Sequence, residues 1–174
     1  MTDVSIRTAD RLGDLGWIVM AHGEIYSREH GWSTAFEEMV AAIVGQYAVD
    51  RDPDAERAWI AEADGERAGC IACMRGEEPG TARLRVLLVD PKRRGLGLGA
   101  ALVDTCVRFA RDAGYRRMVL WTTGNLHSAR TLYQAAGFRL VVMKRNDYRF
   151  LSPRAVSASA RFGVRSVSLL AQRV

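Results

Sequence analysis

A glycine-rich loop is the clearest chemical signal in this sequence. Residues 94–99 read RGLGLG, shortly after an apolar run that ends at Val89 and before a segment with helical spacing of apolar residues. Glycines at alternate positions let backbone N–H groups turn toward a ligand without an intervening Cβ atom, and the N-terminus of a helix favours an anion. The types and spacing of these residues therefore predict a binding site for a diphosphate.

A dinucleotide-binding βαβ unit would show a similar glycine pattern. In such a unit the second parallel strand ends in an acidic residue that binds a ribose. The strand-like segment 119–123 reads VLWTT and offers no such residue. The strand before the glycine loop is also the fourth in the predicted order, so the context excludes a dinucleotide-binding unit.

Length and composition fit one globular domain. The chain has 174 residues, of which 48% are hydrophobic and 26% are charged, and a chain of this size buries about 70% of its unfolded surface. We expect the folded unit over residues 1–145, followed by a basic segment, 146–174, that forms either a terminal strand or a flexible tail. No signal peptide or membrane-spanning run is visible, so we expect a cytoplasmic protein without a membrane partner.

The net charge of +5 is concentrated near the C-terminus. After residue 143 the chain has seven basic side chains and one acidic side chain, which leaves a formal charge of −1 for the rest. A basic field over the whole protein is therefore not supported. Nucleic-acid binding through this segment is an alternative, but a solvated tail is the simpler interpretation, and we expect no nucleic-acid partner.

The three cysteines predict no metal site and no redox pair. Cys70 and Cys73 are three residues apart in a strand-like run, so their side chains face opposite sides. We expect these two and Cys106 to be small buried apolar residues, and we expect no bound metal.

The first half of the chain predicts a short strand and two helices. Helical spacing of apolar residues runs to about His30, where Gly31 interrupts it. Residues 34–37, TAFE, fit a capping box that begins a second helix, which continues to about Val49.

Strands dominate the middle of the chain. The dipeptide Asp64-Gly65 separates two strand-like runs and is a strong hairpin signal. A third run, 82–89, becomes continuously apolar toward the glycine loop, as a central strand does. After the loop we expect a helix over 97–113, a strand over 116–122, a short helix closed by Gly137, and a last strand over 138–143.

Two of these segments together resemble the GNAT superfamily of acyl-CoA N-acyltransferases. Residues 87–99 look like the family's strand and Arg/Gln-x-x-Gly-x-Gly loop, and residues 125–138 look like its Asn…Ala…Leu-Tyr…Ala-Gly-Phe helix. The resemblance covers residues 6–143. It implies an α/β GNAT fold with a mixed, mostly antiparallel central sheet and helices on both faces, and acetyl-CoA as the cosubstrate.

The resemblance also implies where acetyl-CoA binds. Backbone N–H groups of the loop would hold the pyrophosphate, and the strand before it would splay from its parallel neighbour at a bulge, so that pantetheine pairs with its edge. The asparagine that opens the second motif would bind the pantetheine amide, although it fits equally as a helix cap. The predicted cofactor-binding residues are Leu87, Leu88, Val89, Arg94, Gly95, Leu96, Gly97, Leu98, Gly99, Ala100, Asn125, Ser128 and Tyr133.

Three side chains are candidates for proton transfer. Tyr133 occupies the position of the family's general acid, and a phenol with an ordinary pKa near 10 is protonated at neutral pH. His22 and Glu29 are seven residues apart, on one face of the first predicted helix, and the family places this region on the acceptor side. Each is a candidate base, with a structural role as its alternative, and water is an alternative proton carrier.

Residues 22–32, HGEIYSREHGW, look like a segment of the acetyltransferase domains that are fused to MarR-type regulators in bacteria. No winged-helix portion precedes the segment, so the resemblance implies a stand-alone member of that branch. The chain after residue 147 departs from the branch, because it lacks a final strand with Trp and acidic residues.

We therefore predict an N-acetyltransferase that moves an acetyl group from acetyl-CoA to a primary amine by direct attack. The acceptor is a small-molecule amine or a protein amine, and the resemblance allows a homodimer without fixing an interface. The alternative is a regulatory or degenerate protein that binds CoA without turnover.

Overall fold

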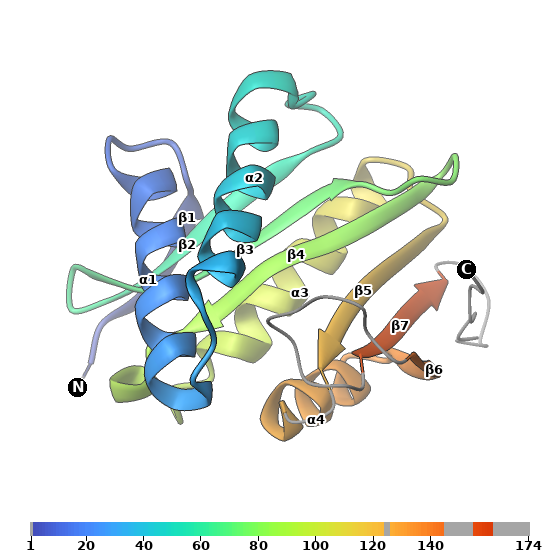
Figure 1. Cartoon of the computed structure of the whole chain (residues 1–174). Helices are drawn as coiled ribbons and strands as arrows, with labels where there is room; N and C mark the ends of the chain where they lie inside the picture. The colour runs from blue at the N-terminus through green and yellow to red at the C-terminus, as the bar shows by residue number, and fades with distance from the viewer. Residues whose placement is uncertain (1, 124–125, 145–154, 162–174) are drawn as a thin grey trace.

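The computed structural model describes residues 2–123, 126–144 and 155–161. Seven strands form one sheet in the order β1-β2-β3-β4-β5-β7-β6 (Figure 1). Of the described strand pairs, β4 and β5 are parallel and the others are antiparallel, which confirms the predicted mixed sheet. The elements are β1 (Val4–Thr8), α1 (Asp14–His30), α2 (Thr34–Asp50), β2 (Arg57–Ala63), β3 (Glu66–Arg75), β4 (Thr81–Val89), η1 (Pro91–Arg93), α3 (Leu98–Asp112), β5 (Arg117–Thr123), α4 (His127–Ala135), β6 (Arg139–Lys144) and β7 (Ala155–Arg161).

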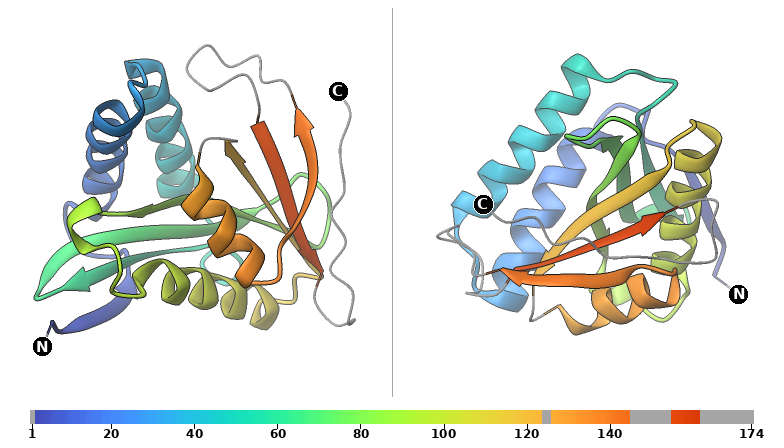
Figure 2. Two further views of the ribbon diagram at one scale, coloured as in Figure 1. Left: turned by 90° about the horizontal axis from the view of Figure 1, so that it is seen from below. Right: turned by 90° about the vertical axis from the view of Figure 1, so that its right-hand side faces the viewer.

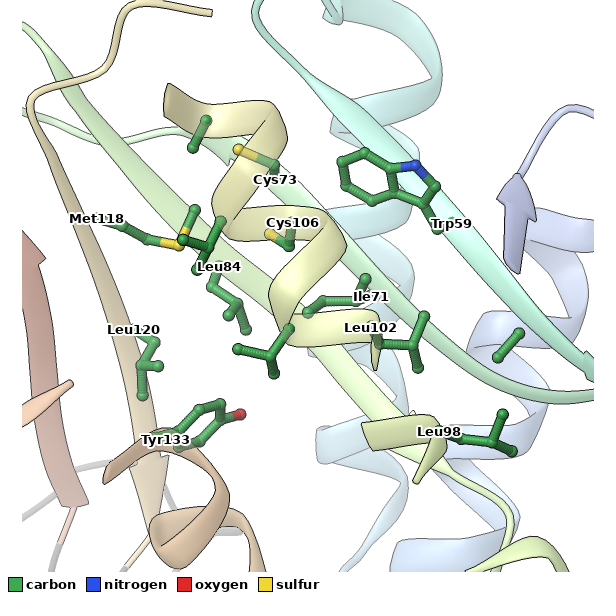
Figure 3. Close-up of a cluster of buried hydrophobic side chains, with 14 of the residues drawn as sticks. Trp59, Ile71, Cys73, Leu84, Leu98, Leu102, Cys106, Met118, Leu120 and Tyr133 are labelled. Atoms are coloured by element: carbon green, nitrogen blue, oxygen red, sulfur yellow. The ribbon is translucent and has the colours of Figure 1, made fainter. Parts of the chain in front are cut away.

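Helices cover both faces of the sheet, as the resemblance implied (Figure 2). The pair α1 and α2 packs on one face, where Ile18, Val40 and Ile60 form the centre of an apolar cluster. Helix α3 packs on the other face with α4 beside it, and there Leu102 and Met118 are fully buried (Figure 3). The sheet is thus the middle layer of three.

Local turn signals set several boundaries. Asp64 and Gly65 have φ values of 53° and 78°, the left-handed pair that a two-residue hairpin requires, so the predicted hairpin between β2 and β3 is confirmed. Gly31 has a φ of 66° and its N–H donates to the carbonyl of Ser27, which ends α1 at the predicted place.

The predicted capping box at the start of α2 is wrong. Ser33 is the N-cap residue, Thr34 already lies in the helix, and no side chain caps it. The Glu37 side chain lies against Gly23 of α1 instead. A Cβ atom on Gly23 would be only 2.2 Å from one of the Glu37 carboxylate oxygens. Contact between the two helices therefore outweighs the local capping pattern.

The start of α1 is tied to the sheet through a buried carboxylate. Asp14 accepts hydrogen bonds from Arg7 at 2.6 Å and from Arg67 at 2.8 Å. Burial raises the pKa of Asp14, but the hydrogen bonds from the two arginines outweigh it and hold that pKa well below its ordinary range. These bonds join β1, α1 and β3.

The C-terminal segment contributes a strand. Residues 155–161 form β7, which lies between β5 and β6 and is antiparallel to both. The expected boundary between residues 145 and 146 stays a prediction.

The cysteines are free and buried. Cys70 belongs to the α1–α2 side and Cys73 to the α3 side, as expected for two residues three apart in a strand. Among the helices that the structure describes, none combines the length and the apolar character needed to cross a bilayer.

Candidate active site

Strands β4 and β5 separate part of the way along the sheet. They pair only from Thr81 to Arg83, opposite Arg117 to Val119, although β4 continues to Val89. Figure 1 shows the two strands diverging beyond this point. Within the described part of the chain, the facing edges of the strands therefore present backbone groups that no neighbouring strand uses. An extended ligand can pair there.

A β-bulge marks the same stretch of β4. Cys70 lies opposite Leu88 and Ala72 opposite Arg85, so two residues of β4 face one residue of β3. The bulge includes Val86, whose φ of 49° is unusual for a β-branched residue. The thiol of Cys70 donates to the carbonyl of Val86 at 3.2 Å, and burial raises the pKa of that thiol, which keeps its proton in place. Both Arg85 and Val86 consequently face the α1–α2 side.

The glycine loop leads into α3 as predicted. Gly95 and Gly97 have φ values of 86° and 75°, and a Cβ atom on either would meet no other atom within 4 Å. The loop backbone thus lies against open space at the N-terminus of a helix, which suits an anion. Gly99 differs, because its Cβ atom would lie 3.1 Å from the side chain of Leu132. Its small size serves the contact between α3 and α4.

Glu29 lies at the glycine loop. Its two carboxylate oxygens accept hydrogen bonds from both terminal nitrogens of Arg94, each at 2.8 Å. The hydrogen bonds from Arg94 lower the pKa of Glu29. Glu29 is therefore ionised and already paired, and this bidentate contact fastens the loop to the end of α1.

A cavity of about 160 Å³ lies between the α1–α2 pair and the split strands. Aromatic and aliphatic side chains form most of its wall, and His22, Leu87 and Tyr133 reach it from three different elements. The described residues of the lining are His22, Tyr26, Trp32, Phe36, Met39, Val40, Ile43, Arg83, Leu84, Arg85, Val86, Leu87, Trp121, Thr122, Leu126, Ala129 and Tyr133.

Tyr133 connects the two faces of the sheet. It lies in the α3-side core beside Phe138 and Leu120 (Figure 3), yet it also lines the cavity on the α1–α2 side. Burial raises the pKa of its phenol far above 10. The pKa of Tyr133 is therefore higher than the ordinary value assumed from the sequence. The phenol is protonated at neutral pH in either case.

His22 is buried and neutral. Its Nδ1 is 2.7 Å from the carbonyl oxygen of Ile18. A carbonyl can only accept, so Nδ1 carries the proton and donates it, and Nε2 keeps the lone pair. Burial lowers the pKa of His22 to about 4, which makes the ring a weak base. The ring stacks on Tyr26 with centroids 5.7 Å apart.

The predicted site residues therefore fall into two groups. His22, Leu87 and Tyr133 share the cavity, whereas Glu29 and the glycine loop share a contact at the end of α1. His22 and Glu29 occupy one helix but are not brought together. Ser128 is exposed near the start of α4. Asn125 lies outside the described residues.

Two lining residues were not expected from the sequence. Arg83 and Thr122 come from different strands, and each has a buried polar atom with no hydrogen-bond partner among the described residues. In the sequence, both residues look like ordinary strand positions with one polar side chain. The separation of β4 and β5 brings Arg83 and Thr122 to one cavity, and no pattern in the neighbouring residues of the sequence indicates that separation.

Comparison with known proteins agrees with this architecture. A family model described as "Acetyltransferase (GNAT) family" matches residues 19–138. Rat N-acetyltransferase family 8 member 2 is 39% identical over 85 residues, which are 47% of this chain and 38% of the rat protein. Human N-acetyltransferase 8B is 38% identical over 85 residues, which are 47% of this chain and 37% of the human protein. The matched region is thus less than half the length of these relatives.

Solved structures share the fold at low sequence identity. A GNAT-family acetyltransferase from Staphylococcus aureus has a TM-score of 0.74 at 18% identity, covering 92% of this chain and 100% of that chain. A putative acetyltransferase from Salmonella typhimurium, solved with its cofactor acetyl-CoA, has a TM-score of 0.72 at 18% identity, covering 95% and 98%. Because the family model spans more than half of the sequence and the fold recurs in these structures, this chain belongs to the GNAT acetyltransferase family.

Proposed function

We propose that this protein is an N-acetyltransferase that moves the acetyl group of acetyl-CoA directly onto a primary amine. The observation that supports this most strongly is the split between β4 and β5, into which Tyr133 reaches from α4. An open strand edge, a cavity and a protonated phenol meet there. Members of the family use acetyl-CoA, and the Salmonella neighbour was solved with it.

The residues at the split fit acetyl-CoA. Backbone N–H groups from Gly95 to Ala100 hold the pyrophosphate, since Gly95 and Gly97 leave open space beside the start of α3. The N–H of Arg94 already donates to the carbonyl of Pro91. The edge of β4 from Leu87 to Val89 pairs with pantetheine. Ser128, near the start of α4, completes this proposed site, and a role for Asn125 in it stays a prediction.

Glu29 acts in this scheme through the loop. Its bidentate pair with Arg94 fixes the position of the glycine loop against α1. A carboxylate that is bound in this way and lies away from the cavity lining is poorly placed to accept a proton from the amine. We therefore assign Glu29 a positioning role in place of the predicted role as a base.

The reaction needs a donor for the departing sulfur. Bound acetyl-CoA supplies a thioester carbonyl that an amine can attack. Tyr133 donates a hydrogen bond to the sulfur, and its raised pKa keeps the phenol protonated throughout the physiological range. Because an ordinary thiol has a pKa of about 8.5, the proton at equilibrium favours the phenol, and Tyr133 works mainly through this hydrogen bond.

The acceptor amine must be neutral when it attacks. His22 has a pKa of about 4, so it is deprotonated at neutral pH and can accept a hydrogen bond at Nε2, but it is too weak a base to hold the proton of an ammonium group. Water therefore takes that proton and returns one to the CoA thiolate that leaves when the C–S bond breaks, and His22 orients the amine or the water.

We also propose that the chain lies near the branch of acetyltransferase domains that are fused to MarR-type regulators. The likeness of residues 22–32 to those domains supports this, and the same segment supplies His22, Tyr26 and Trp32 to the cavity wall. Tyr26 lies 4.9 Å from Trp32 and 4.8 Å from Phe36, measured between ring centroids. These rings form the wall that meets the acceptor.

The experiment is amine-dependent release of thiol from acetyl-CoA by the full chain, with the Tyr133→Phe variant and calorimetric CoA binding in parallel. The change removes one hydroxyl that has no hydrogen-bond partner in the described chain. We expect kcat to fall about 100-fold while the Kd for CoA stays within about twofold. Thiol release at the parental rate by Tyr133→Phe would contradict the role of Tyr133. CoA binding without release for any amine would favour the regulatory alternative.

A further inference from the structure

The charged side chains in the described lining of the cavity on the α1–α2 side are basic. Among its described lining residues the charged side chains are Arg83 and Arg85, and no aspartate or glutamate is present. His22 adds no charge at neutral pH. Arg83 can therefore attract an anionic group of the acceptor in this poorly solvated space.

Arg83 has an unused hydrogen-bond donor. Its Nη2 donates to Glu77 at 3.1 Å, and its guanidinium carbon is 5.7 Å from the ring centroid of Trp121. Its Nε is buried and has no partner among the described residues. Glu77 is 75% exposed and does not belong to the described lining. The buried free N–H of this guanidinium can donate to a ligand carboxylate, while Nη2 stays paired with Glu77.

Thr122 supplies a second unpaired group at the same cavity. Its Oγ1 is buried without a partner in the described chain. Three buried side-chain atoms are unpartnered in this way, Arg83 Nε, Arg117 Nε and Thr122 Oγ1, and two of them belong to lining residues of this one cavity. Buried polar groups are normally satisfied, so two such groups at one cavity indicate a polar ligand.

The remaining wall suits an apolar body of limited size. The aromatic side chains are Tyr26, Trp32, Phe36, Trp121 and Tyr133, and the aliphatic side chains come from α2, from β4 and from the start of α4. A cavity near 150 Å³ holds a molecule of about the size of benzene, and this cavity measures about 160 Å³. One aromatic or aliphatic side chain fits it.

We propose that the acceptor is an amino acid with an aromatic or large aliphatic side chain, whose carboxylate is bound by Arg83. This rests on the proposed acetyl transfer. Arg83 is three residues before Val86, a separation of about 10 Å along a strand, and Arg83, Val86 and Thr122 line the same cavity. The carboxylate therefore binds at Arg83 and Thr122 while the amine faces the bulge.

The first test compares acceptors on the unaltered protein. Phenylalanine, leucine and methionine are each paired with the corresponding amide, and putrescine represents the cationic acceptors. The amides have the more readily deprotonated amine, so reactivity alone would favour them. We expect kcat/KM for at least one acid to exceed that of its amide about 10- to 100-fold, with putrescine the poorest acceptor. Equal or better use of every amide would overturn the inference and leave the transferase proposal standing.

Variants then assign the preference to Arg83. Arg83→Met keeps much of the apolar stem and removes the charge, and we expect it to abolish the preference for the acid. Arg117→Met is the matched control, since Arg117 is as buried, is paired with Glu78 and is not among the lining residues. It should keep the preference. Thr122→Val should weaken the preference by about three- to tenfold. A preference that persists in Arg83→Met would overturn the role of Arg83.

A binding arm separates this inference from the proposed function. Calorimetry with CoA present measures N-acetylphenylalanine against its amide on the parent protein. Tighter binding of the acid without turnover of any amine would support the acceptor site and contradict the transferase. Equal Kd values for N-acetylphenylalanine and its amide, with or without turnover of an amine, would contradict the proposed carboxylate-binding acceptor site. The comparison needs no variant, so it holds even if Arg83→Met fails to fold.

Discussion

The two faces of the central sheet are packed in different ways. On the α3 face, Leu98, Leu102 and Met118 are at most 1% exposed and form a continuous apolar core. On the α1–α2 face, the core borders a cavity with two buried polar groups that lack partners in the described chain. The α1–α2 face therefore combines an apolar core with room for a ligand.

The largest expected effect is on the free energy of unfolding, which should fall much more for a truncation in the α3-side core than for one at the cavity wall. Leu102→Ala leaves a void in the α3 core and should lower the free energy of unfolding by about 4 kcal/mol. Met39→Ala, on the cavity wall and only partly buried, should lower it by less than about 1 kcal/mol, because the cavity already exists there. Urea denaturation measures both. Equal losses would show that the two faces share the stabilising role.

The next effect concerns the glycine loop. Gly97→Glu places a negative charge and a strained backbone at the start of α3, so it should weaken CoA binding more than about 100-fold in calorimetry. Gly114→Glu is the control, because Gly114 has a similar φ of 83° and equally open surroundings beyond the other end of α3. Parental affinity in Gly97→Glu, or equal weakening in Gly114→Glu, would contradict a pyrophosphate site at the loop.

A pH effect of intermediate size belongs to His22. Its pKa is about 4 in the folded protein and about 6.5 in an unfolded chain. Between these values the unfolded state takes up the proton and the native state does not, so stability is lost as the pH falls from 6.5 to 4. The loss should be about 2 to 3 kcal/mol.

The measurement is denaturation of the parent protein and of His22→Gln at pH 7 and pH 4. Glutamine can keep the hydrogen bond to Ile18 but does not titrate. The parent should lose more stability than the variant by the stated amount. Identical losses would mean that His22 is not held neutral by burial.

The smallest effect is expected from the pair of Glu29 and Arg94. Their side chains are 29% and 51% exposed, so a double-mutant cycle with Glu29→Gln and Arg94→Gln should give a coupling of about 0.5 kcal/mol. The pKa of Glu29 is lowered, so the coupling is present above the ordinary carboxyl pKa and disappears as the pH falls through the lowered value. It should also shrink in 1 M salt. A coupling that ignores both pH and salt would indicate that the pair is not electrostatic.

Local signals and distant contacts were not equally predictable. Gly31 and Asp64-Gly65 end or turn the chain through their own backbone preferences, so the sequence predicts these points directly. The anion-binding loop at Gly97 was equally predictable, because consecutive residues of the sequence, 94–99, form it. The split of β4 and β5 came from a family resemblance, and the structure puts its bulge at Val86, a residue type that does not favour a positive φ.

The less predictable features join residues that are far apart in the chain. Glu29 and Arg94 are 65 positions apart in the sequence, and nothing near either residue in the sequence indicates that they form a pair. Arg83 and Thr122 reach one cavity only because two parallel strands diverge. A polar residue in a strand resembles any exposed edge position until the sheet is assembled, so the sequence alone did not reveal the acceptor side.

The most direct test of the central claim is a crystal structure of the full chain with CoA bound. We expect the pyrophosphate on the backbone of residues 95–100, pantetheine paired with β4 from Leu87 to Val89, and the sulfur within hydrogen-bond reach of the Tyr133 hydroxyl. Pantetheine lying outside the split between β4 and β5, or a sulfur beyond the reach of Tyr133, would contradict it.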